Sequence, residues 1–306
     1  MAGMLHPAAR PCQLFTLEIG SALPIVPAVK EKPMNDHQSI ETGGYEHRFG
    51  GLFRLYGKTA MDALRKAHVL IVGVGGVGSW VAEALARSGI GRITLVDWDD
   101  ICFSNTNRQV HAMTGTAGRA KVDILAERIQ LINPECRVTP IREFYTDKNA
   151  DALITSDLSY VVDAIDRKNA KIHLITQCKT MGIPVIVSGG AGGRIDPSQV
   201  RTTDLRDSYN DALLASIRKQ LRKNIPGMHL QHKKPFHIPC VFSAEPIRYP
   251  HPDGGICMEK PDAGDGPKQL DCQFGFGSAT FLTGSFGFAM AARIINDLTH
   301  SHDPTK

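Results

Sequence analysis

The chain has 306 residues, of which 42% are hydrophobic and 22% charged, and its formal net charge is +4. These values are ordinary for a soluble globular protein with a large core, and so small a charge alone decides nothing about nucleic acid binding. The seven cysteines include no Cys-x-x-Cys pair, so we expect no structural zinc, and nothing resembles a secretory signal, so we expect a cytoplasmic protein.

The first 44 residues differ from the rest of the chain. Prolines interrupt them at positions 7, 11, 24, 27 and 33, and no apolar periodicity lasts long enough for a helix or a strand. We therefore expect residues 1–44 to be a disordered extension, with Met34 as a candidate native start. Residues 45–300 are expected to form one domain.

Short apolar runs alternate with amphipathic segments in the next part of the chain, after a first helix near residues 53–66. Strands that alternate with helices predict an α/β fold with a doubly wound, mostly parallel sheet. The expected strands lie near 69–72, 93–96, 137–142, 160–164 and 184–187, and the expected helices near 76–88, 118–132 and 168–181.

The alternation ends at the glycines of residues 189–193. Residues 200–204 begin what we expect to be a smaller, antiparallel C-terminal portion. Residues 212–223 predict an amphipathic helix, because their leucine and isoleucine side chains fall on one face and their basic side chains on the other.

A segment near the C-terminus, residues 273–292, carries no charge. Its glycines and hydroxyl groups dilute its hydrophobicity, so a packing helix is favoured over a membrane span. The expected parts of the domain are a nucleotide-binding half at 67–190, a substrate-facing portion at 191–272 and a C-terminal packing helix at 273–298.

A glycine motif follows the strand at 69–72, with Gly73, Gly75, Gly76 and Gly78 leading into the next helix. Glycine lets the backbone approach a phosphate closely, and a helix N-terminus supplies free N–H donors. Asp97, at the end of the next strand, can accept hydrogen bonds from both ribose hydroxyls. The motif predicts a nucleotide site that fits NAD, FAD and ATP equally well.

Polar residues after Asp97 favour a nucleoside triphosphate. Arg108 and Lys121 are suited to neutralise the β- and γ-phosphates, Arg108 by a planar fork and Lys121 as a point charge. Asn105 can donate an uncharged hydrogen bond to the same oxygens. Asp166, after the strand near 160–164, lies where ligands of open α/β sheets bind, and it can hold Mg²⁺.

These residues and their spacing resemble the nucleotide site of the E1-like superfamily of ATP-dependent carboxylate-adenylating enzymes (ThiF, MoeB and HesA), whose sheet is Rossmann-like and doubly wound. Within that superfamily the chain resembles the tRNA threonylcarbamoyladenosine dehydratase family over roughly residues 45–298. The matching stretches are Arg48–Gly51, Arg54–Gly57, Thr106–Gln109, Ile132–Val138, Gly189–Gly193, Cys240–Ser243 and Met258–Phe276.

The resemblance implies a substrate and a reaction. N6-threonylcarbamoyladenosine next to the tRNA anticodon would be cyclised through an acyl-adenylate, with a net loss of water. Arg108 and Lys121 would stabilise the departing pyrophosphate and Asp166 would hold Mg²⁺, which makes these three the expected catalytic residues. The implied cofactors are ATP and Mg²⁺, with a monovalent cation (K⁺ or Na⁺) as an option, and the implied partners are tRNA, a second copy of the chain and, as an option, a cysteine desulfurase or sulfur-acceptor system.

Three other candidates come from the same resemblance. Arg48 and Arg54 match an N-terminal arginine element that in relatives reaches ATP across a dimer, and the sequence leaves open which of them takes this part. Cys240 invites comparison with the thioester cysteine of ubiquitin-type enzymes, but cyclisation needs no enzyme thiol, so a catalytic role for Cys240 is the less favoured of two open alternatives. A basic segment is a candidate for tRNA contact, through Arg218, Lys219, Arg222, Lys223, Lys233 and Lys234.

Two other functions remain open from the sequence. One is an adenylyltransferase that activates the C-terminal glycine of a sulfur-carrier protein. The missing zinc cysteines and the basic segment argue against it. The other is an NAD(P)-binding oxidoreductase or a nucleotide-sensing scaffold, which has no evident need for the polar residues after Asp97.

Overall fold

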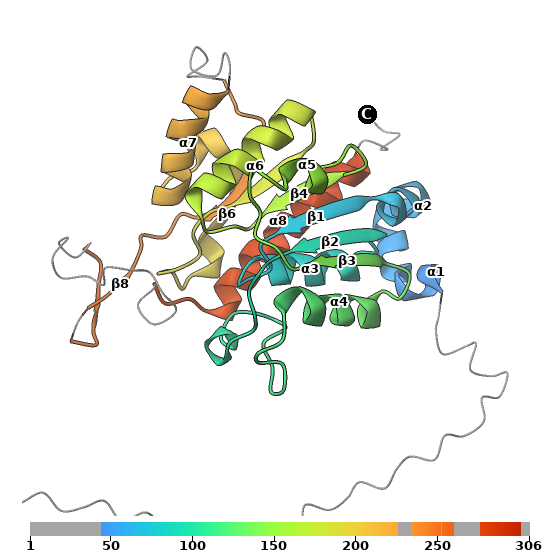
Figure 1. Ribbon diagram of the computed structural model, residues 1–306, viewed down its shortest axis with the longest axis horizontal. Helices are drawn as coiled ribbons and strands as arrows, with labels where there is room; N and C mark the ends of the chain where they lie inside the picture. Colours follow the sequence, from blue (N-terminus) through green and yellow to red (C-terminus); the bar gives the residue numbers. More distant parts are fainter. Residues whose placement is uncertain (1–43, 226–233, 252, 260–275, 301–306) are drawn as a thin grey trace, which may run out of the picture. The chain divides into compact units, whose positions relative to one another are not determined.

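The computed structural model describes residues 44–225, 234–251, 253–259 and 276–300 (Figure 1). The expected disordered extension therefore lies outside the described residues, except for Gly44. In chain order the elements are α1 (Tyr45–Arg48), α2 (Gly50–Lys66), β1 (His68–Val72), α3 (Gly78–Arg87), β2 (Arg92–Val96), η2 (Phe103–Asn105), α4 (Lys121–Ile132), β3 (Arg137–Ile141), α5 (Ala150–Leu153), β4 (Tyr160–Asp163), α6 (Lys168–Met181), β5 (Val185–Ser188), η3 (Pro197–Gln199), β6 (Val200–Asp204), η4 (Leu205–Asp207), α7 (Ala212–Asn224), β7 (Pro239–Ser243), β8 (Tyr249–Pro250), β9 (Ile256–Cys257) and α8 (Thr280–His300).

The strands β1 to β7 form one sheet with the order β3-β2-β1-β4-β5-β7-β6. All neighbours pair in parallel except β6, which runs antiparallel to β7 at one edge. The doubly wound, mostly parallel α/β sheet predicted from the sequence is thus confirmed. The antiparallel portion is confirmed as well: β6 extends the main sheet, and β8 pairs with β9 in a separate ribbon.

The composition of the strands explains why the sheet is parallel. All five residues of β1 are buried, with Val69 and Ile71 in the core on one face and Leu70 and Val72 in the core on the other. Strands buried on both faces read as continuous apolar runs, which parallel sheets require. The edge strand β3 is more exposed and tolerates Pro140, which a central strand would exclude.

Helices cover both faces of the sheet (Figure 1). On one face α3, α4 and α8 contribute to a core that also includes residues of α2. On the other face α5, α6 and α7 form the second core. The turns after β1, β2 and β4 lie at the carboxyl ends of the parallel strands, which is where open α/β sheets bind ligands.

The C-terminal helix α8 lies very close to α3. A Cβ at position 287 would come within 2.6 Å of the Trp80 Cβ and 3.0 Å of the Val77 carbonyl oxygen, so the glycine at this position lets the two helices approach. This helix begins later than the segment 273–298 in which we expect a packing helix, and residues 273–275 lie outside the described part of the chain. None of the described helices is both long enough and apolar enough to cross a membrane.

Candidate nucleotide-binding site

The turn between β1 and α3 is built around two glycines. Gly73 has a φ of +87°, and a Cβ there would come within 2.8 Å of the Ala164 carbonyl oxygen. A Cβ at Gly78 would overlap the carbonyl group of Gly73. The helix begins at Gly78, two residues later than expected, although Val77 before it already has helical dihedral angles.

Gly75 and Gly76 have a different role, since they face side chains of the loop after β2. A Cβ at Gly75 would lie 3.9 Å from Gln109 Nε2, and a Cβ at Gly76 would lie 3.6 Å from Arg108 Cδ. The structure therefore brings the predicted phosphate loop and the predicted phosphate-binding arginine together, although about 30 residues of sequence separate them.

Asp97 follows β2 and is tied to the same loop. Its carboxylate accepts hydrogen bonds from the backbone N of Val74 at 2.8 Å and of Asp99 at 2.9 Å. Burial raises the pKa of Asp97, while the positive charge of Lys121 acts in the opposite direction. A carboxylate has about four lone-pair sites, so two backbone donors leave room for ribose hydroxyls.

Arg108 is held by neutral groups. Its guanidinium donates to the Ser104 carbonyl oxygen at 2.8 Å and to Asn107 Oδ1 at 2.9 Å, and its own carbonyl oxygen accepts a hydrogen bond from Trp80 Nε1 at 3.1 Å. No carboxylate of the described residues forms a salt bridge with it. The positive charge of Arg108 therefore stays available for an anion at the glycine loop.

Asn105 is buried at the end of η2. Its Oδ1 accepts a hydrogen bond from the Cys102 backbone N at 3.0 Å, which closes the turn and fixes the side chain. This bond uses the acceptor of the amide and leaves the Nδ2 donors for the predicted contact with phosphate.

Lys121 begins α4 and is nearly buried. Its Nζ donates to Asp99 Oδ2 at 2.8 Å. The predicted phosphate-binding lysine is thus paired with a carboxylate that we did not select from the sequence. A triphosphate would have to replace Asp99 or share the ammonium group with it.

The two carboxylates near the end of β4 have different environments. Asp163 is fully buried and forms an ion pair of 2.7 Å with Lys171, which is also fully buried. Asp166 is exposed in the turn between β4 and α6, and this turn touches the glycine loop where Ala164 meets Gly73. The strand ends at Asp163, so Asp166 lies beyond it rather than on it.

The donor set around Asp166 sets a limit on how Mg²⁺ could bind. The described residues contain no group of three or more His, Cys, Asp or Glu that could hold a metal ion. Mg²⁺ is commonly held by one or two carboxylates together with substrate phosphates and water. Asp166 fits that arrangement and not a metal site made by protein alone.

Gln109 and His111 are polar residues of this region to which sequence reasoning assigned no role. Both are buried, and neither Gln109 Oε1 nor either ring nitrogen of His111 has a hydrogen-bond partner among the described residues. Burial lowers the pKa of His111 to about 4, and the nearby charges of Lys121 and Arg128 act in the same direction. The position of Gln109 directly after Arg108 was the one available signal for its place at the loop.

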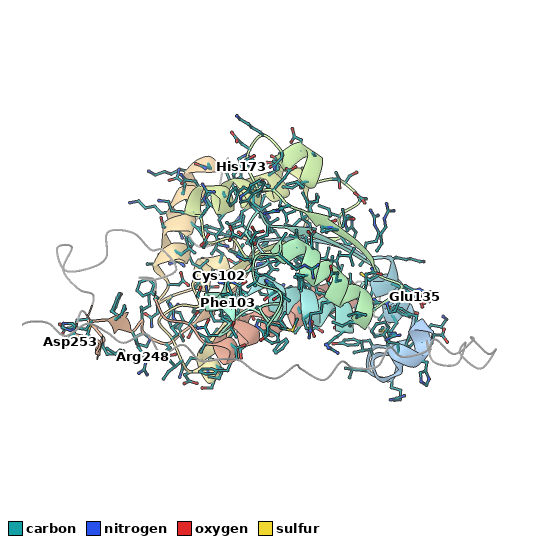
Figure 2. All side chains as sticks on the ribbon, turned by 60° about the horizontal axis from the view of Figure 1, so that its bottom comes forward. Cys102, Phe103, Glu135, His173, Arg248 and Asp253 are labelled. Carbon is teal, nitrogen blue, oxygen red and sulfur yellow. The ribbon has the colours of Figure 1, made fainter. Side chains whose placement is uncertain are left out.

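Arg48 and Arg54 lie away from this site. Arg48 is exposed and donates to the Ile132 carbonyl oxygen at 3.2 Å, near Glu135, which accepts a hydrogen bond from the Tyr45 backbone N. Figure 2 shows Glu135 well separated from Cys102 and Phe103, which mark the loop that contains Arg108. Arg54 is exposed in α2, and this helix lies at the same end of the domain as α1 (Figure 1).

Cys240 is buried in β7, where burial raises the pKa of its thiol to about 12. A reactive thiol needs a lowered pKa and access to solvent. The surroundings of Cys240 therefore favour a structural role.

The basic residues of the segment 218–234 divide into two groups. Arg218 donates to Ser208 Oγ, and the guanidinium of Arg222 lies 5.4 Å from the Phe236 ring centroid, so both turn toward the protein. The other described residues of the group, Lys219, Lys223 and Lys234, are exposed, and Lys233 lies outside the described residues.

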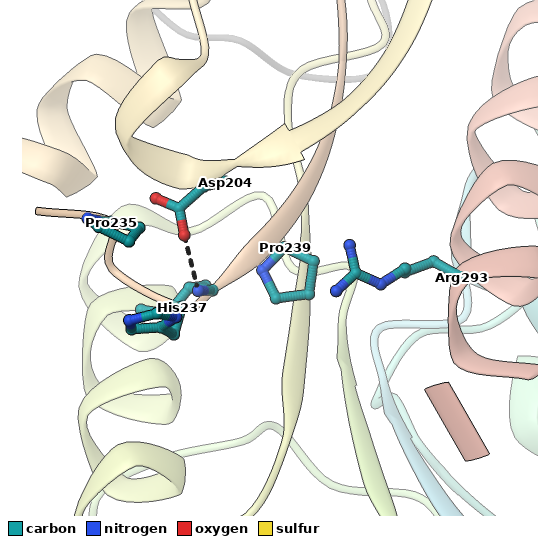
Figure 3. A pocket seen from close by; sticks show the side chains of 6 residues that line it. Asp204, Pro235, His237, Pro239 and Arg293 are labelled. Atoms are coloured by element: carbon teal, nitrogen blue, oxygen red, sulfur yellow. Dashed lines mark hydrogen bonds between the residues drawn. The ribbon is translucent and has the colours of Figure 1, made fainter. Parts of the chain in front are cut away.

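A cavity of about 300 Å³ lies elsewhere, next to the start of β7 (Figure 3). Asp204 shapes it by accepting hydrogen bonds from the backbone N of Phe236 and Ile238, at 2.9 and 3.2 Å. The strand β7 runs parallel to β1. Its first residue, Pro239, therefore lies at the amino ends of the parallel strands, whereas the glycine loop lies at their carboxyl ends. This cavity is not part of the nucleotide site.

Comparisons with known proteins identify the family of the chain. Residues 50–304 match the ThiF family. The chain is 46% identical over 259 residues to the tRNA threonylcarbamoyladenosine dehydratase of Escherichia coli (strain K12), covering 85% of this chain and 96% of that protein.

Solved structures show the same similarity. A structure described as TcdA (CsdL) has a TM-score of 0.75 and 43% identity, over 84% of this chain and 95% of that chain. The E. coli dehydratase in complex with ATP has a TM-score of 0.71 and 41% identity over the same shares. The protein described here belongs to the ThiF family and, within it, to the tRNA threonylcarbamoyladenosine dehydratases.

Proposed function

We propose that the protein uses ATP to cyclise N6-threonylcarbamoyladenosine next to the anticodon of tRNA. The observation that carries the proposal is the convergence of Asp97, Arg108 and Gln109 on the glycine loop, in a chain that matches dehydratases over nearly their whole length. The loop and its neighbours supply what an ATP-dependent activation of a carboxylate requires, namely phosphate donors, positive charge and a ribose acceptor.

The proposed reaction has two steps. In the first step a carboxylate oxygen of the threonine moiety attacks the α-phosphorus of ATP, and pyrophosphate leaves with the electrons of the broken P–O bond. In the second step a ureido nitrogen attacks the activated carbonyl carbon and loses its proton, and AMP leaves. The net change in the nucleoside is the loss of one water molecule, whose oxygen is carried away on AMP.

The residues of the site have roles that follow from their positions. Arg108 and Lys121 neutralise the pyrophosphate as its charge develops, and such fixed positive charges act most strongly where water is excluded. Asn105 donates to the same oxygens, and Asp97 holds the ribose. These contacts fix the α-phosphorus in line with the incoming carboxylate.

Mg²⁺ fits the site with Asp166 as its ligand from the protein. When bound, it would withdraw electron density from the phosphate oxygens and neutralise part of their charge. The exposed carboxylate of Asp166, in the turn that touches the glycine loop, would hold the ion.

Two partners belong to the proposal. The separation of Arg48 and Arg54 from the glycine loop supports a homodimer in which one of these arginines reaches the partner's nucleotide. Among the described residues of the basic segment, Lys219, Lys223 and Lys234 are exposed, and these lysines would contact tRNA phosphates. A monovalent cation and a sulfur-transfer partner do not enter the stoichiometry of the two steps, and both expectations rest on the resemblance alone.

The test is nucleoside analysis of tRNA. The purified protein, incubated with ATP, Mg²⁺ and tRNA that carries the linear nucleoside, should convert it to the cyclic form and release AMP and pyrophosphate in equal amounts. Adenylation of the C-terminal glycine of a sulfur-carrier protein, without any change in the tRNA, would instead support the alternative function.

A further inference from the structure

A fully buried ion pair lies next to the turn that carries Asp166. The Asp163 carboxylate and the Lys171 ammonium group are 2.7 Å apart, and neither side chain is exposed. Removing two charges from water costs free energy that their attraction seldom returns in full, so an apolar pair of similar size would often stabilise a fold as well or better. Stability alone therefore does not account for an ion pair at this position.

The pair holds the backbone on both sides of Asp166. Lys171 Nζ donates to Asp163 Oδ1 at 2.7 Å and to the Asp163 carbonyl oxygen at 3.1 Å, which fixes the last residue of β4. Asp163 Oδ1 also accepts a hydrogen bond from the Ile165 backbone N at 3.2 Å. The Lys171 backbone N donates to the Arg167 carbonyl oxygen at 3.0 Å. Both chain neighbours of Asp166 are thus tied to members of the ion pair.

The side chain of Asp166 has no such support of its own. It forms no hydrogen bond or ion pair with the described residues, so its position depends on the backbone of the turn. The following helix, α6, has no side-chain cap at Arg167 and no acidic residue in its first turn. Groups that surround a metal ligand commonly fix its orientation. Around Asp166 this support comes from the backbone that the ion pair holds.

The same turn packs against the glycine loop. The Ala164 backbone N donates to the Val72 carbonyl oxygen at 3.0 Å, and a Cβ at Gly73 would come within 2.8 Å of the Ala164 carbonyl oxygen. A shift of the turn would therefore change the distance between the Asp166 carboxylate and the loop that receives the phosphates.

We propose that the Asp163–Lys171 ion pair is the positioning element for Asp166: it holds the turn of residues 164–167 so that this carboxylate meets Mg²⁺ beside the glycine loop. The inference rests on the proposed function, in which Asp166 is the Mg²⁺ ligand from the protein. Both members of the pair are fully buried, so they act through Asp166 and not by contact with the substrate. An ion pair that served only the core would change the stability of the fold and leave the response to Mg²⁺ unchanged.

Isothermal titration calorimetry with ATP, at a series of Mg²⁺ concentrations and in EDTA, tests the inference. The double variant Asp163→Leu, Lys171→Met removes both charges at similar side-chain size, so it should stay folded. The Mg²⁺ concentration that gives half of the effect on ATP affinity should rise about 10- to 100-fold, the usual result of losing a group that orients a metal ligand. ATP affinity in EDTA should not change. A wild-type Mg²⁺ requirement in this variant would overturn the inference.

A second buried carboxylate supplies the matched control. Glu83 pairs with Arg128 at 2.6 Å and joins α3 to α4. The double variant Glu83→Leu, Arg128→Met should keep the wild-type Mg²⁺ requirement, and equal effects of the two double variants would show that the loss of any buried pair loosens the site.

Two conservative variants complete the series. Lys171→Arg keeps the charge and the donors of the side chain, so it should retain most of the wild-type response to Mg²⁺. Asp163→Asn keeps the size of the side chain and an acceptor for the Ile165 N–H, and it should raise the Mg²⁺ requirement less than the double variant does. This variant decides the question if the double variant does not fold, and a wild-type requirement in it would then overturn the inference.

A double-mutant cycle with Asp166→Ala separates the inference from the proposed function. In the Asp166→Ala background, removal of the ion pair should have no further effect on the Mg²⁺ requirement, because the pair acts through that carboxylate. Additive effects would overturn the inference alone, whereas a requirement that Asp166→Ala leaves unchanged would also refute the proposed role of Asp166. Failure of the wild-type protein to cyclise the modified nucleoside would refute the proposed reaction, and the response of ATP binding to Mg²⁺ would still decide the inference.

Discussion

The guanidinium of Arg108 hydrogen-bonds only neutral oxygens within the described part of the chain, so its charge remains for a phosphate. Arg108→Ala should lower the rate of ATP–pyrophosphate exchange, measured with modified tRNA, by at least about 100-fold, the usual loss for one donor to a developing negative charge. Arg119→Ala is the matched control, because Arg119 pairs with Glu127 on an exposed face of the molecule. Equal activity in both variants would remove Arg108 from the site.

His111 predicts a dependence of stability on pH. Its pKa falls from the ordinary value of 6.5 to about 4 in the folded protein because the ring is buried beside Lys121 and Arg128. Between these values the unfolded chain binds a proton that the folded chain does not, so stability falls as the pH is lowered. Linkage gives a loss of about 2 kcal/mol between pH 7 and pH 5 from this group.

Urea unfolding of the wild-type protein and of His111→Phe at both pH values checks this. The variant should lose less stability on acidification by about that amount, since phenylalanine cannot be protonated and neither ring nitrogen of His111 has a partner among the described residues. An identical loss in both proteins would show that other groups govern the acid response.

Single site residues could be predicted from the sequence where they lie close to the glycine motif along the chain and have a distinctive side chain. Asp97 and Arg108 were selected from their order along the chain, and the structure brings both to the glycine loop. Asp99 was missed, because its pairing with Lys121 depends on where α4 begins in space. The inward turn of Arg218 and Arg222 was missed for a similar reason: a helical period tells which face is apolar, but not which long side chain folds back onto it.

Among the elements, the contact between α3 and α8 makes the sharpest prediction. Gly287→Ala should destabilise the fold by about 1–3 kcal/mol, because the added carbon would lie 2.6 Å from Trp80 Cβ in a packed seam. Gly284→Ala on the same helix is the control. Its added carbon would meet only ordinary contacts at 3.8 Å, and alanine favours helix, so this variant should be neutral or stabilising by up to about 1 kcal/mol.

Thermal or urea unfolding measures the difference. The contact between α3 and α8 extends to the nucleotide site, because the Trp80 indole donates to the Arg108 carbonyl oxygen. Gly287→Ala should therefore also weaken ATP binding, while Gly284→Ala should not. Equal free energies of unfolding for Gly287→Ala and Gly284→Ala would show that α3 and α8 move apart to accommodate the added carbon.

The strand and helix pattern was predictable wherever apolar runs were buried on both sides. β1, β2, β4 and β5 lie within one residue or so of their expected positions, since each is a short apolar run bounded by turns. β7 was not expected as a strand. Its five residues resemble many buried segments, and only pairing with β5 and β6 identifies them as part of the sheet.

Arg48 and Arg54 lie at a different end of the domain from the glycine loop. If Arg54 or Arg48 acts on the partner's nucleotide, a mixture of two inactive variants should recover activity. Arg108→Ala mixed with Arg54→Ala, or with Arg48→Ala, forms heterodimers with one intact site, which amounts to about a quarter of all sites at random exchange.

Activity before and after exchange of subunits is the measurement. Recovery with only one of the two pairs identifies the arginine that crosses the interface. Absence of recovery in both mixtures, with subunit exchange confirmed, would contradict an active site shared between two chains.

The hydrogen bond from Lys121 to Asp99 has a consequence for turnover. If Lys121 binds the phosphates of ATP, it does so with a counter-ion already in place, so ATP has to replace Asp99 or share the ammonium group with it. After activation of the carboxylate, Asp99 would compete with pyrophosphate for the same ammonium group and would repel the departing diphosphate by its own charge. The same side chain would therefore slow the arrival of ATP and speed the departure of pyrophosphate, and turnover would be fastest when this pair is neither too weak nor too strong.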